Sequence, residues 1–218
     1  QGSGIKDFLL SSVSAASNPG QPSPDQITHG TSMAETILRG VSLTDTSANG
    51  TPVRILPVDV YGASESTTTF DVGKGIDAAL AGGATIINMS LGSAGDSPFV
   101  QQIIQSAHQQ GAIFVGAAGN TPVTTPTYPA AYPEVIAVTA GDRSGQLATY
   151  ANRGPFIDVM APGADVVQYN NQAYLGQGTS FSTAYVSGVA AGLVSTTSKP
   201  LSQVEADVRR RLAYTPRP

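Results

Sequence analysis

The sequence predicts an α/β fold, a doubly wound and mostly parallel sheet with helices on both faces. Helical and strand-like segments alternate through residues 29–139, which is typical of strand–helix–strand units. Residues 84–89 and 112–117 form continuous apolar runs, as expected for strands that are covered on both faces. The connections are short, so residues 1–218 are predicted to form a single domain without a linker.

Each predicted element follows from the spacing of its apolar residues and from the residues that end it. The helix over 179–196 is almost uncharged and apolar on nearly all faces, so it is predicted to lie buried in the middle of the domain. The last helix is expected to begin with Ser202 as N-cap and Glu205 three residues later, a capping box. The predicted elements are helices over 29–41, 70–81, 98–110, 179–196 and 201–213, and strands over 53–61, 84–89, 112–117, 135–139, 156–160, 165–169 and 173–175.

The composition excludes several classes of function. Charged residues make up 12% of the chain and the net charge is −4, which argues against the basic faces of a nucleic-acid-binding protein. Cysteine is absent and there are two histidines, so disulfides, thiolate catalysis and multi-histidine or cysteine metal centres are excluded. No apolar run reaches the roughly 18 residues of a membrane span, and the low charge without cysteine suits a secreted protein. We therefore expect no cofactor, no nucleic-acid partner and no membrane partner.

Three short motifs lie where predicted strands end or helices begin, which is where sheets of this class bind ligands. His29 opens the first helix, Asn120 follows the strand over 112–117, and Ser180 lies at the start of the buried helix. Each residue alone also fits a structural role, as a capping or surface histidine, a turn asparagine beside glycine, or an N-cap serine. Together they form a chemical set: a histidine can remove the serine proton, the serine can attack an acyl carbon, and the asparagine amide can donate to the oxyanion.

Longer stretches around these motifs resemble the subtilisin-like serine peptidases, the subtilase family. Residues 28–37 (THGTSMAETI) are similar to the histidine helix of the family, and residues 111–120 (GAIFVGAAGN) to its oxyanion strand. Residues 87–92 (INMSLG) resemble its substrate-binding strand, and residues 178–191 (GTSFSTAYVSGVAA) its nucleophile helix. The matches follow the order of the family over residues 28–212, which is most of the chain.

The resemblance implies a role for each motif residue. Ser180 would be the nucleophile, His29 the general base and then the general acid, and the Asn120 amide would form the oxyanion hole with the Ser180 backbone N–H. The substrate would be a polypeptide that adds as an extended strand to a backbone edge. The implied substrate-binding residues are Ser90, Leu91 and Gly92 on that edge, Gly62 and Ala63 on the opposite edge, and Ala118 and Gly119 beside a roomy, apolar pocket.

The catalytic aspartate of the family has no match in this sequence, so the triad is incomplete. In relatives it opens an Asp-[Ser/Thr]-Gly motif at the end of the first strand, but the closest string here places Gly2 at that position. The strand that leads into the aspartate is expected to be missing, and residues 1–3 have the character of a tag remnant. Asp7 and Asp25 are the only acids before His29, and neither has the flanking motif.

Two functions from different classes follow. The leading hypothesis is a serine endopeptidase that acts through an acyl-enzyme on Ser180, with weak activity in the absence of the aspartate. The alternative is a catalytically silent subtilase-like domain that binds a peptide or a partner chain. A propeptide, or an N-terminal segment outside these residues, is the further expected partner. A nucleotide-binding domain is not supported, because no glycine-rich phosphate loop follows a predicted strand.

Overall fold

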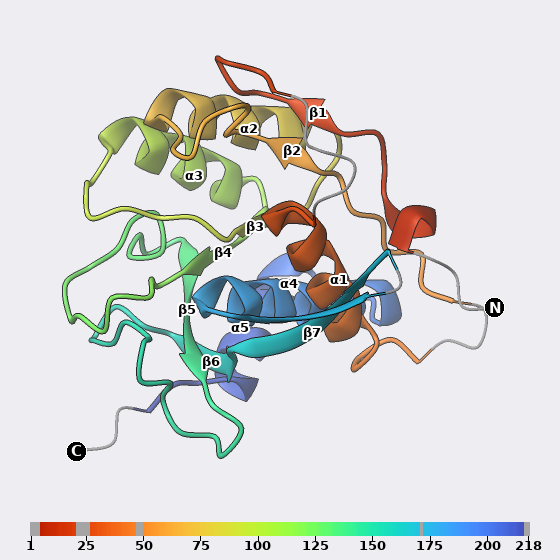
Figure 1. Ribbon diagram of the computed structural model, residues 1–218, viewed down its shortest axis with the longest axis vertical. Helices are drawn as coiled ribbons and strands as arrows, with labels where there is room; N and C mark the ends of the chain where they lie inside the picture. The colour runs from red at the N-terminus through yellow and green to blue at the C-terminus, as the bar shows by residue number, and fades with distance from the viewer. Residues whose placement is uncertain (1–4, 21–26, 47–49, 171, 216–218) are drawn as a thin grey trace.

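The structure, a computed structural model, describes residues 5–20, 27–46, 50–170 and 172–215. A central parallel sheet lies between helices that cover both of its faces (Figure 1). The predicted doubly wound α/β class is therefore confirmed. The strands of this sheet, in spatial order, are β3 (Ile86–Met89), β4 (Ile113–Ala117), β5 (Val135–Gly141) and β6 (Val159–Pro162), each parallel to its neighbour.

Apolar side chains alternate between the two faces of this sheet and form two cores. Phe114 belongs to the core on one face, whereas Ile113 and Val115 belong to the core on the other. Strands β4 and β5 are buried along their whole length, as predicted for strands at the centre of such a sheet. The covering helices are α2 (Thr69–Ala81) and α3 (Pro98–Gln109) on the first face, and α4 (Thr179–Thr196) and α5 (Leu201–Arg211) on the second.

Helix α1 (His29–Val41) packs along α4 at very close range. Glycines on α4 allow this approach: a Cβ on Gly188 would lie 2.0 Å from the carbonyl oxygen of Ile37, and a Cβ on Gly192 would lie 2.9 Å from that of Val41. Both contacts join residues whose numbers differ by 151. The two helices therefore run parallel and stay in step from turn to turn.

Two small two-stranded sheets flank the central one. One of them, the hairpin that contains Asp165, is attached to α1. Asp165 accepts a hydrogen bond from the buried Thr36 hydroxyl and forms an ion pair with Arg39, both at 3.0 Å. The paired strands are β1 (Val13–Ser14) with β2 (Val58–Asp59), which are parallel, and β7 (Ala164–Tyr169) with β8 (Gln172–Gln177), which are antiparallel.

The strand prediction over 53–61 is wrong for most of its length. Only Val58–Asp59 form a strand there, because this segment pairs with short N-terminal pieces, β1 and a single bridge between Leu9 and Ile55, rather than with the central sheet. None of the helices in the described part of the chain has the length and apolar character needed to cross a bilayer.

The capping box predicted for the last helix is also wrong. Helix α5 begins at Leu201 with Pro200 as its N-cap, so Ser202 lies inside the helix and caps nothing. Proline is tolerated at this place because the φ of Pro200, −57°, lies in the range that its ring fixes. Glu205 instead faces α3, where its Oε2 lies 2.9 Å from Nε2 of His108.

Candidate active site

Ser180 lies in the first turn of α4, two residues after Gly178, whose positive φ favours a residue without a Cβ. Gly178 has φ of 145°, and its N–H donates to the carbonyl of Gly163 at 2.8 Å. Gly178, the N-cap, has no side chain that could cap the helix, and the Ser180 N–H has no acceptor among the described residues. The first N–H groups of an 18-residue helix carry partial positive charge, so they favour a negative oxygen beside Ser180.

Asn120 is held against this helix start by its side-chain oxygen. Asn120 Oδ1 accepts hydrogen bonds from the Thr179 N–H at 2.8 Å and from the Thr179 hydroxyl at 3.1 Å. The same hydroxyl accepts the N–H of Gly119 at 3.1 Å, so Thr179 locks both the loop and the amide.

The locked orientation leaves the amino group of the amide available. Asn120 is exposed, and its Nδ2 lies 3.2 Å from the point where a Cβ would stand on Gly178. Nδ2 forms no hydrogen bond with the described residues, which matches the state of the Ser180 N–H. Two donors without acceptors therefore lie at the start of the helix that carries Ser180, which is an arrangement that can stabilise an oxyanion.

His29 lies at the same end of the α1–α4 pair as Ser180. One turn after His29, Met33 packs with Phe181 and Ala184 of α4. The contacts between the two helices join residues whose numbers differ by 151. If this offset continues to the start of both helices, His29 corresponds to Ser180. The His29 side chain is exposed and makes no hydrogen bond with any described residue, so it is not bonded to the serine.

Ser90, which follows β3, contacts Ser180 directly. The Ser180 hydroxyl donates to the carbonyl of Ser90 at 3.4 Å, and the Ser90 hydroxyl donates to the carbonyl of Ser180 at 3.1 Å. The edge predicted to hold a substrate therefore lies next to the predicted nucleophile. The next residues of this edge, Leu91 and Gly92, line a pocket.

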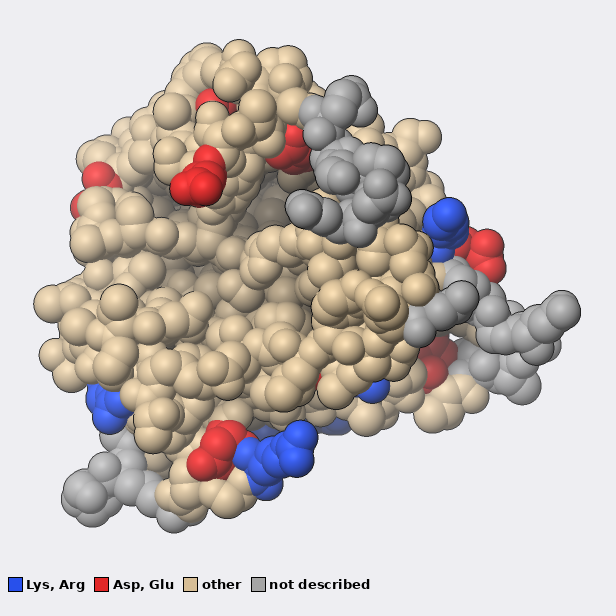
Figure 2. Space-filling model, viewed as in Figure 1, with Lys and Arg blue, Asp and Glu red and all other residues tan. Residues whose placement is uncertain are grey.

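This pocket, which we call the cleft pocket, has a volume of about 280 Å³. Its apolar floor includes the buried residues Val72, Val100 and Tyr132. Glu65 lines it as well, and none of the described Lys or Arg residues does. Figure 2 shows this face hollowed near its centre, with the Lys and Arg residues near its outer margins. The remaining lining residues are Tyr61, Ser66, Thr67, Thr68, Thr69, Leu91, Gly92, Ser93, Gly95, Ser97, Tyr128 and Pro129.

The phenol of Tyr132 is fixed at the floor of the cleft pocket. It donates to Asp96 Oδ1 at 2.9 Å and accepts the Ser97 N–H at 2.9 Å. Burial, followed by the hydrogen bond to Asp96, raises the pKa of Tyr132 to about 12. The floor is therefore neutral at any ordinary pH, and the charges near the pocket are carboxylates.

Gly62 and Ala63 do not line the cleft pocket. The Gly62 N–H donates to Asp59 Oδ1 at 2.8 Å, and the Ala63 N–H donates to the Asn18 carbonyl at 3.0 Å. Their donors are thus used within the chain. The segment that lies across from Leu91 in the pocket is residues 65–69, which sequence reasoning missed because a run of Ser and Thr carries no motif.

Ala118 and Gly119 lie between β4 and Asn120, next to a buried asparagine that was also missed. Asn152 donates to the Ala118 carbonyl at 2.7 Å and accepts the Thr121 N–H at 2.9 Å, so it holds the loop on both sides of Asn120. Gly119, with φ of 105°, has no room for a side chain, since a Cβ would lie 2.5 Å from the Asn152 amide. An isolated Asn in a loop gives no sequence signal for such a role.

The acids considered as substitutes for the missing aspartate find no support. Asp7 is exposed on the short 3-10 helix η1 (Ile5–Phe8), and Asp25 lies outside the described residues. No carboxylate of the described ranges hydrogen-bonds to His29. Within those ranges, no group of three or more His, Asp or Glu side chains is arranged to hold a metal ion.

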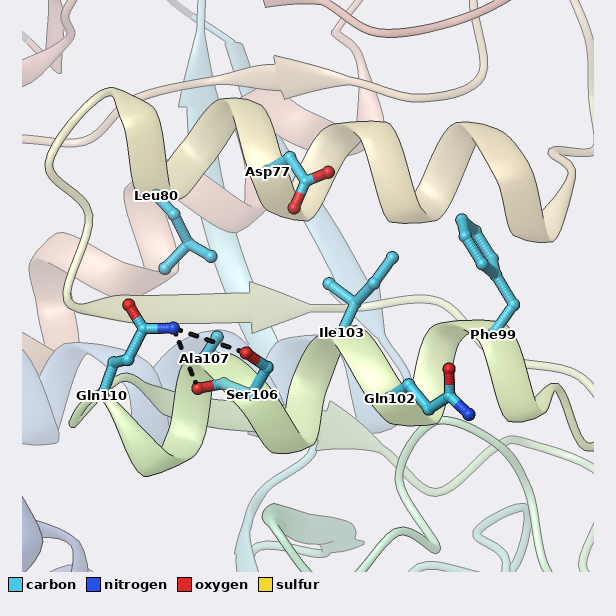
Figure 3. Close-up of a pocket in the computed structure, with 8 residues that line it drawn as sticks. All are labelled: Asp77, Leu80, Phe99, Gln102, Ile103, Ser106, Ala107 and Gln110. Carbon is cyan, nitrogen blue, oxygen red and sulfur yellow. Dashed lines mark hydrogen bonds between the residues drawn. The ribbon is translucent and has the colours of Figure 1, made fainter.

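A second hollow lies between α2 and α3 and contains none of the predicted site residues. It has a volume of about 310 Å³, and Figure 3 shows side chains of both helices converging on it. Leu80, Ile103 and Phe99 give it an apolar wall, and Gln110 donates to the carbonyl and hydroxyl of Ser106 at one end.

The model of the Subtilase family matches residues 8–215. The chain is 38% identical over 194 residues to a thermostable alkaline protease of Halalkalibacterium halodurans, covering 86% of this chain and 52% of that protein. It is 33% identical over 200 residues to subtilisin Savinase of Lederbergia lenta, covering 90% of this chain and 73% of the relative. The chain thus spans about half the length of the first of these relatives.

Solved structures agree with these sequence comparisons. The protease domain of PatA superposes with a TM-score of 0.72 at 26% identity, covering 92% of this chain and 78% of that domain. A lanthipeptide protease gives a TM-score of 0.78 over 93% of this chain and 73% of its own length; at 21% identity it supports the fold alone.

Proposed function

Because the chain belongs to the subtilase family, we propose that it is a serine endopeptidase that cleaves extended polypeptides through an acyl-enzyme on Ser180. The observation that carries the proposal is the paired set of donors at the start of α4. Asn120 Nδ2 and the Ser180 N–H have no acceptor among the described residues, and Thr179 fixes the amide that carries the first. Such preorganised donors stabilise the negative oxygen that forms when a serine attacks a carbonyl.

In the proposed reaction, Ser180 Oγ attacks the carbonyl carbon of the scissile peptide. His29 takes the hydroxyl proton and later gives it to the leaving amine. Before substrate binds, the Ser180 hydroxyl donates to the Ser90 carbonyl over 3.4 Å, which is long for an O–H···O bond. A substrate N–H that pairs with the Ser90 carbonyl would replace this weak bond and free the hydroxyl to turn toward His29.

Substrate binding is proposed to use backbone pairing on one side and pockets on the other. Ser90, Leu91 and Gly92 would pair with the extended substrate, and the adjacent cleft pocket would receive one of its side chains. Ala118 and Gly119 would border the site for the residue before the scissile bond. Gly62 and Ala63 would support the opposite edge without pairing with the substrate through their N–H groups, since these N–H groups already have acceptors.

The cleft pocket suggests which side chain it would take. An apolar floor with Glu65 at the wall suits the methylene stem and cationic end of Lys or Arg. Glu65 is exposed and forms no ion pair with a described residue. We therefore infer a modest preference for a basic residue on the non-prime side of the cleaved bond.

Full activity would need a carboxylate on the ring nitrogen of His29 that faces away from Ser180. We propose that an aspartate on an extended segment outside residues 1–218 supplies it. In support, β3 pairs on one side only among the described strands, and β1 with β2 forms a separate sheet, so a parallel strand can add to the free edge of β3. Loss of the aspartate costs about four orders of magnitude in subtilisin itself, so the given chain alone is expected to acylate slowly.

The alternative is a catalytically silent domain that binds a peptide without cleaving it. It is favoured by one observation, the lack of a carboxylate bonded to His29 in the described residues. A propeptide would be an occupant of the same cleft. The low charge and lack of cysteine support secretion or another extracytoplasmic location for either function.

Labelling with a biotinylated fluorophosphonate tests the proposal, with Ser180→Ala as the matched control. We expect slow, stoichiometric modification of Ser180, found by peptide mass mapping, that is lost in Ser180→Ala and much slower in His29→Ala. Modification spread over other hydroxyls, or none after prolonged incubation at high probe concentration, would favour the silent domain. A version of the chain that carries the proposed aspartate segment should be labelled orders of magnitude faster.

A further inference from the structure

Asn88 is the one polar side chain in the strand β3, and it takes part in a chain of hydrogen bonds beneath Ser180. Its Oδ1 accepts the hydroxyl of Ser187, which lies two turns into α4, at 3.0 Å. Its Nδ2 donates to Ser90 Oγ at 3.0 Å, and Ser90 Oγ donates to the carbonyl of Ser180 at 3.1 Å. The amide thus links the strand, the substrate edge and two turns of the nucleophile helix.

The amide fixes the direction of its bond to Ser90. An amide N–H only donates, so Ser90 Oγ must accept from Asn88, whereas the single proton of the Ser187 hydroxyl lies within reach of both Asn88 Oδ1 at 3.0 Å and the Thr183 carbonyl at 2.9 Å. Because Ser90 Oγ accepts a hydrogen bond from Asn88 Nδ2, the Ser90 O–H is oriented away from Asn88. It donates a hydrogen bond to the Ser180 carbonyl. A residue without the amino group could not impose this direction.

Ser90 therefore holds Ser180 by two groups at once. Its hydroxyl binds the Ser180 carbonyl, and its carbonyl binds the Ser180 hydroxyl. The first bond fixes the backbone of the nucleophile and persists when substrate arrives. The second is the one that substrate pairing would replace. The group that orients the Ser90 hydroxyl therefore also determines how the start of α4 lies against the substrate edge.

We propose that Asn88 is a positioning residue for acyl transfer, which acts through Ser90 to keep the first turn of α4 at a fixed place relative to the substrate edge. The proposal rests on the proposed function of Ser180 and adds to it a residue that touches neither substrate nor the reacting atoms. Its consequence is selective. Loss of the amide should slow acylation of bound substrate or probe, while the concentration at half-saturation stays the same, because the edge and the pocket keep their own shape.

The experiment measures the maximal rate constant and half-saturating concentration of fluorophosphonate labelling in a double-mutant cycle. Asn88→Ala and Ser90→Ala should each lower the maximal rate by about 3- to 10-fold, the worth of one hydrogen bond. The double variant should be no slower than the slower single variant, because both break the same chain. Ser182→Ala is the matched control: its buried hydroxyl donates to the Ala161 carbonyl at 3.0 Å, in the same turn but outside this chain. It should lower stability and leave the labelling rate unchanged.

Asn88→Asp gives a second, nearly isosteric test. The ionised carboxylate has no donor for Ser90, whereas the protonated carboxyl group regains one. The ratio of the variant rate to the wild-type rate should therefore rise as pH falls from 6 to 4, toward the ordinary pKa of an aspartate at about 3.9, a dependence that a merely structural defect would not produce. Additive losses in the cycle, an equal loss in Ser182→Ala, or a ratio that does not change with pH would each overturn the proposal.

A failure of the proposed function would look different. The wild-type chain would then not be labelled at all. Amide hydrogen exchange of residues 179–184 would in that case test whether Asn88 positions the first turn of α4. Equal and non-additive increases in exchange for Asn88→Ala and Ser90→Ala would support the positioning role. Exchange as slow as in the wild-type chain would contradict it.

Discussion

The carbonyl oxygen of Ile37 lies 2.0 Å from the point that a Cβ on Gly188 would occupy. This contact sets how close the helix of His29 can come to the helix of Ser180. Any side chain at position 188 would push the two backbones apart, and the two first turns would separate with them.

Gly188→Ala is therefore expected to lower the free energy of unfolding by about 1–3 kcal/mol through overpacking against backbone. Urea unfolding followed by circular dichroism measures this change. Gly95→Ala is the control, since the nearest atom to its added Cβ is Ser93 Oγ at 3.8 Å. A loss in Gly188→Ala no larger than in the control would show that the helix pair can relax, contrary to this view.

Asn120→Asp separates the two ends of the amide. The aspartate keeps an oxygen for the two Thr179 donors but replaces Nδ2 by a second oxygen, which would repel an oxyanion. We expect kcat for a peptide substrate to fall by at least the roughly 100- to 1000-fold that removal of an oxyanion donor costs in subtilisin itself, with little change in KM. A change confined to KM would assign Asn120 to substrate binding instead.

Stability should fall in acid because of Asp71. The Lys74 ammonium at 2.7 Å and then the Ser17 hydroxyl at 2.5 Å hold the pKa of Asp71 well below its usual value. A depressed pKa in the folded state means that the unfolded chain takes up the proton first, so this contribution is full above about pH 4 and is lost as pH falls further.

Asp71→Asn should accordingly reduce the difference in unfolding free energy between pH 7 and pH 3, as measured by urea titration at both pH values. Asp77→Asn, on the exposed side of the same helix, serves as control and should keep the wild-type difference. Equal behaviour of the two variants would place the acid sensitivity elsewhere.

Glu65→Gln tests the basic preference of the cleft pocket. Peptides that carry Lys or Met at each position before the cleaved bond have side chains of similar length that differ in charge. At the position that enters the pocket, the ratio of kcat/KM for Lys over Met should fall by about 2- to 5-fold in the variant, the range for an exposed ion pair. The same ratio should fall in the wild-type protein as salt is raised. A ratio that does not depend on residue 65 at any position would contradict the preference.

The residues predicted from the sequence for the site lie at the ends of elements that the sequence also predicts. His29, Asn120 and Ser180 each open or follow an element whose limits the apolar pattern defines, and the structure brings all three to one end of the α1–α4 pair or its adjoining loop. The helix over 179–196 was predicted with both of its limits correct.

The residues that were missed act across long distances in the sequence. Asn152 supports a loop about 30 positions earlier, and Asn88 contacts Ser187 of the last buried helix. Their partners cannot be inferred from their neighbours. A signal for Asn88 was nevertheless present, because a polar amide in a strand otherwise made of apolar residues needs buried partners.

The offset of 151 between α1 and α4 also bears on how the chain folds as it is made. Helix α1 leaves the ribosome early, with Met33, Ala34 and Val41 destined for burial, but the helix that covers them is synthesised about 8–30 s later at ordinary rates of translation. Throughout that interval its apolar face has no permanent cover. The pairing of α1 with α4 is thus a late and non-local event, so folding is expected to be slow and to benefit from a chaperone that shields this face.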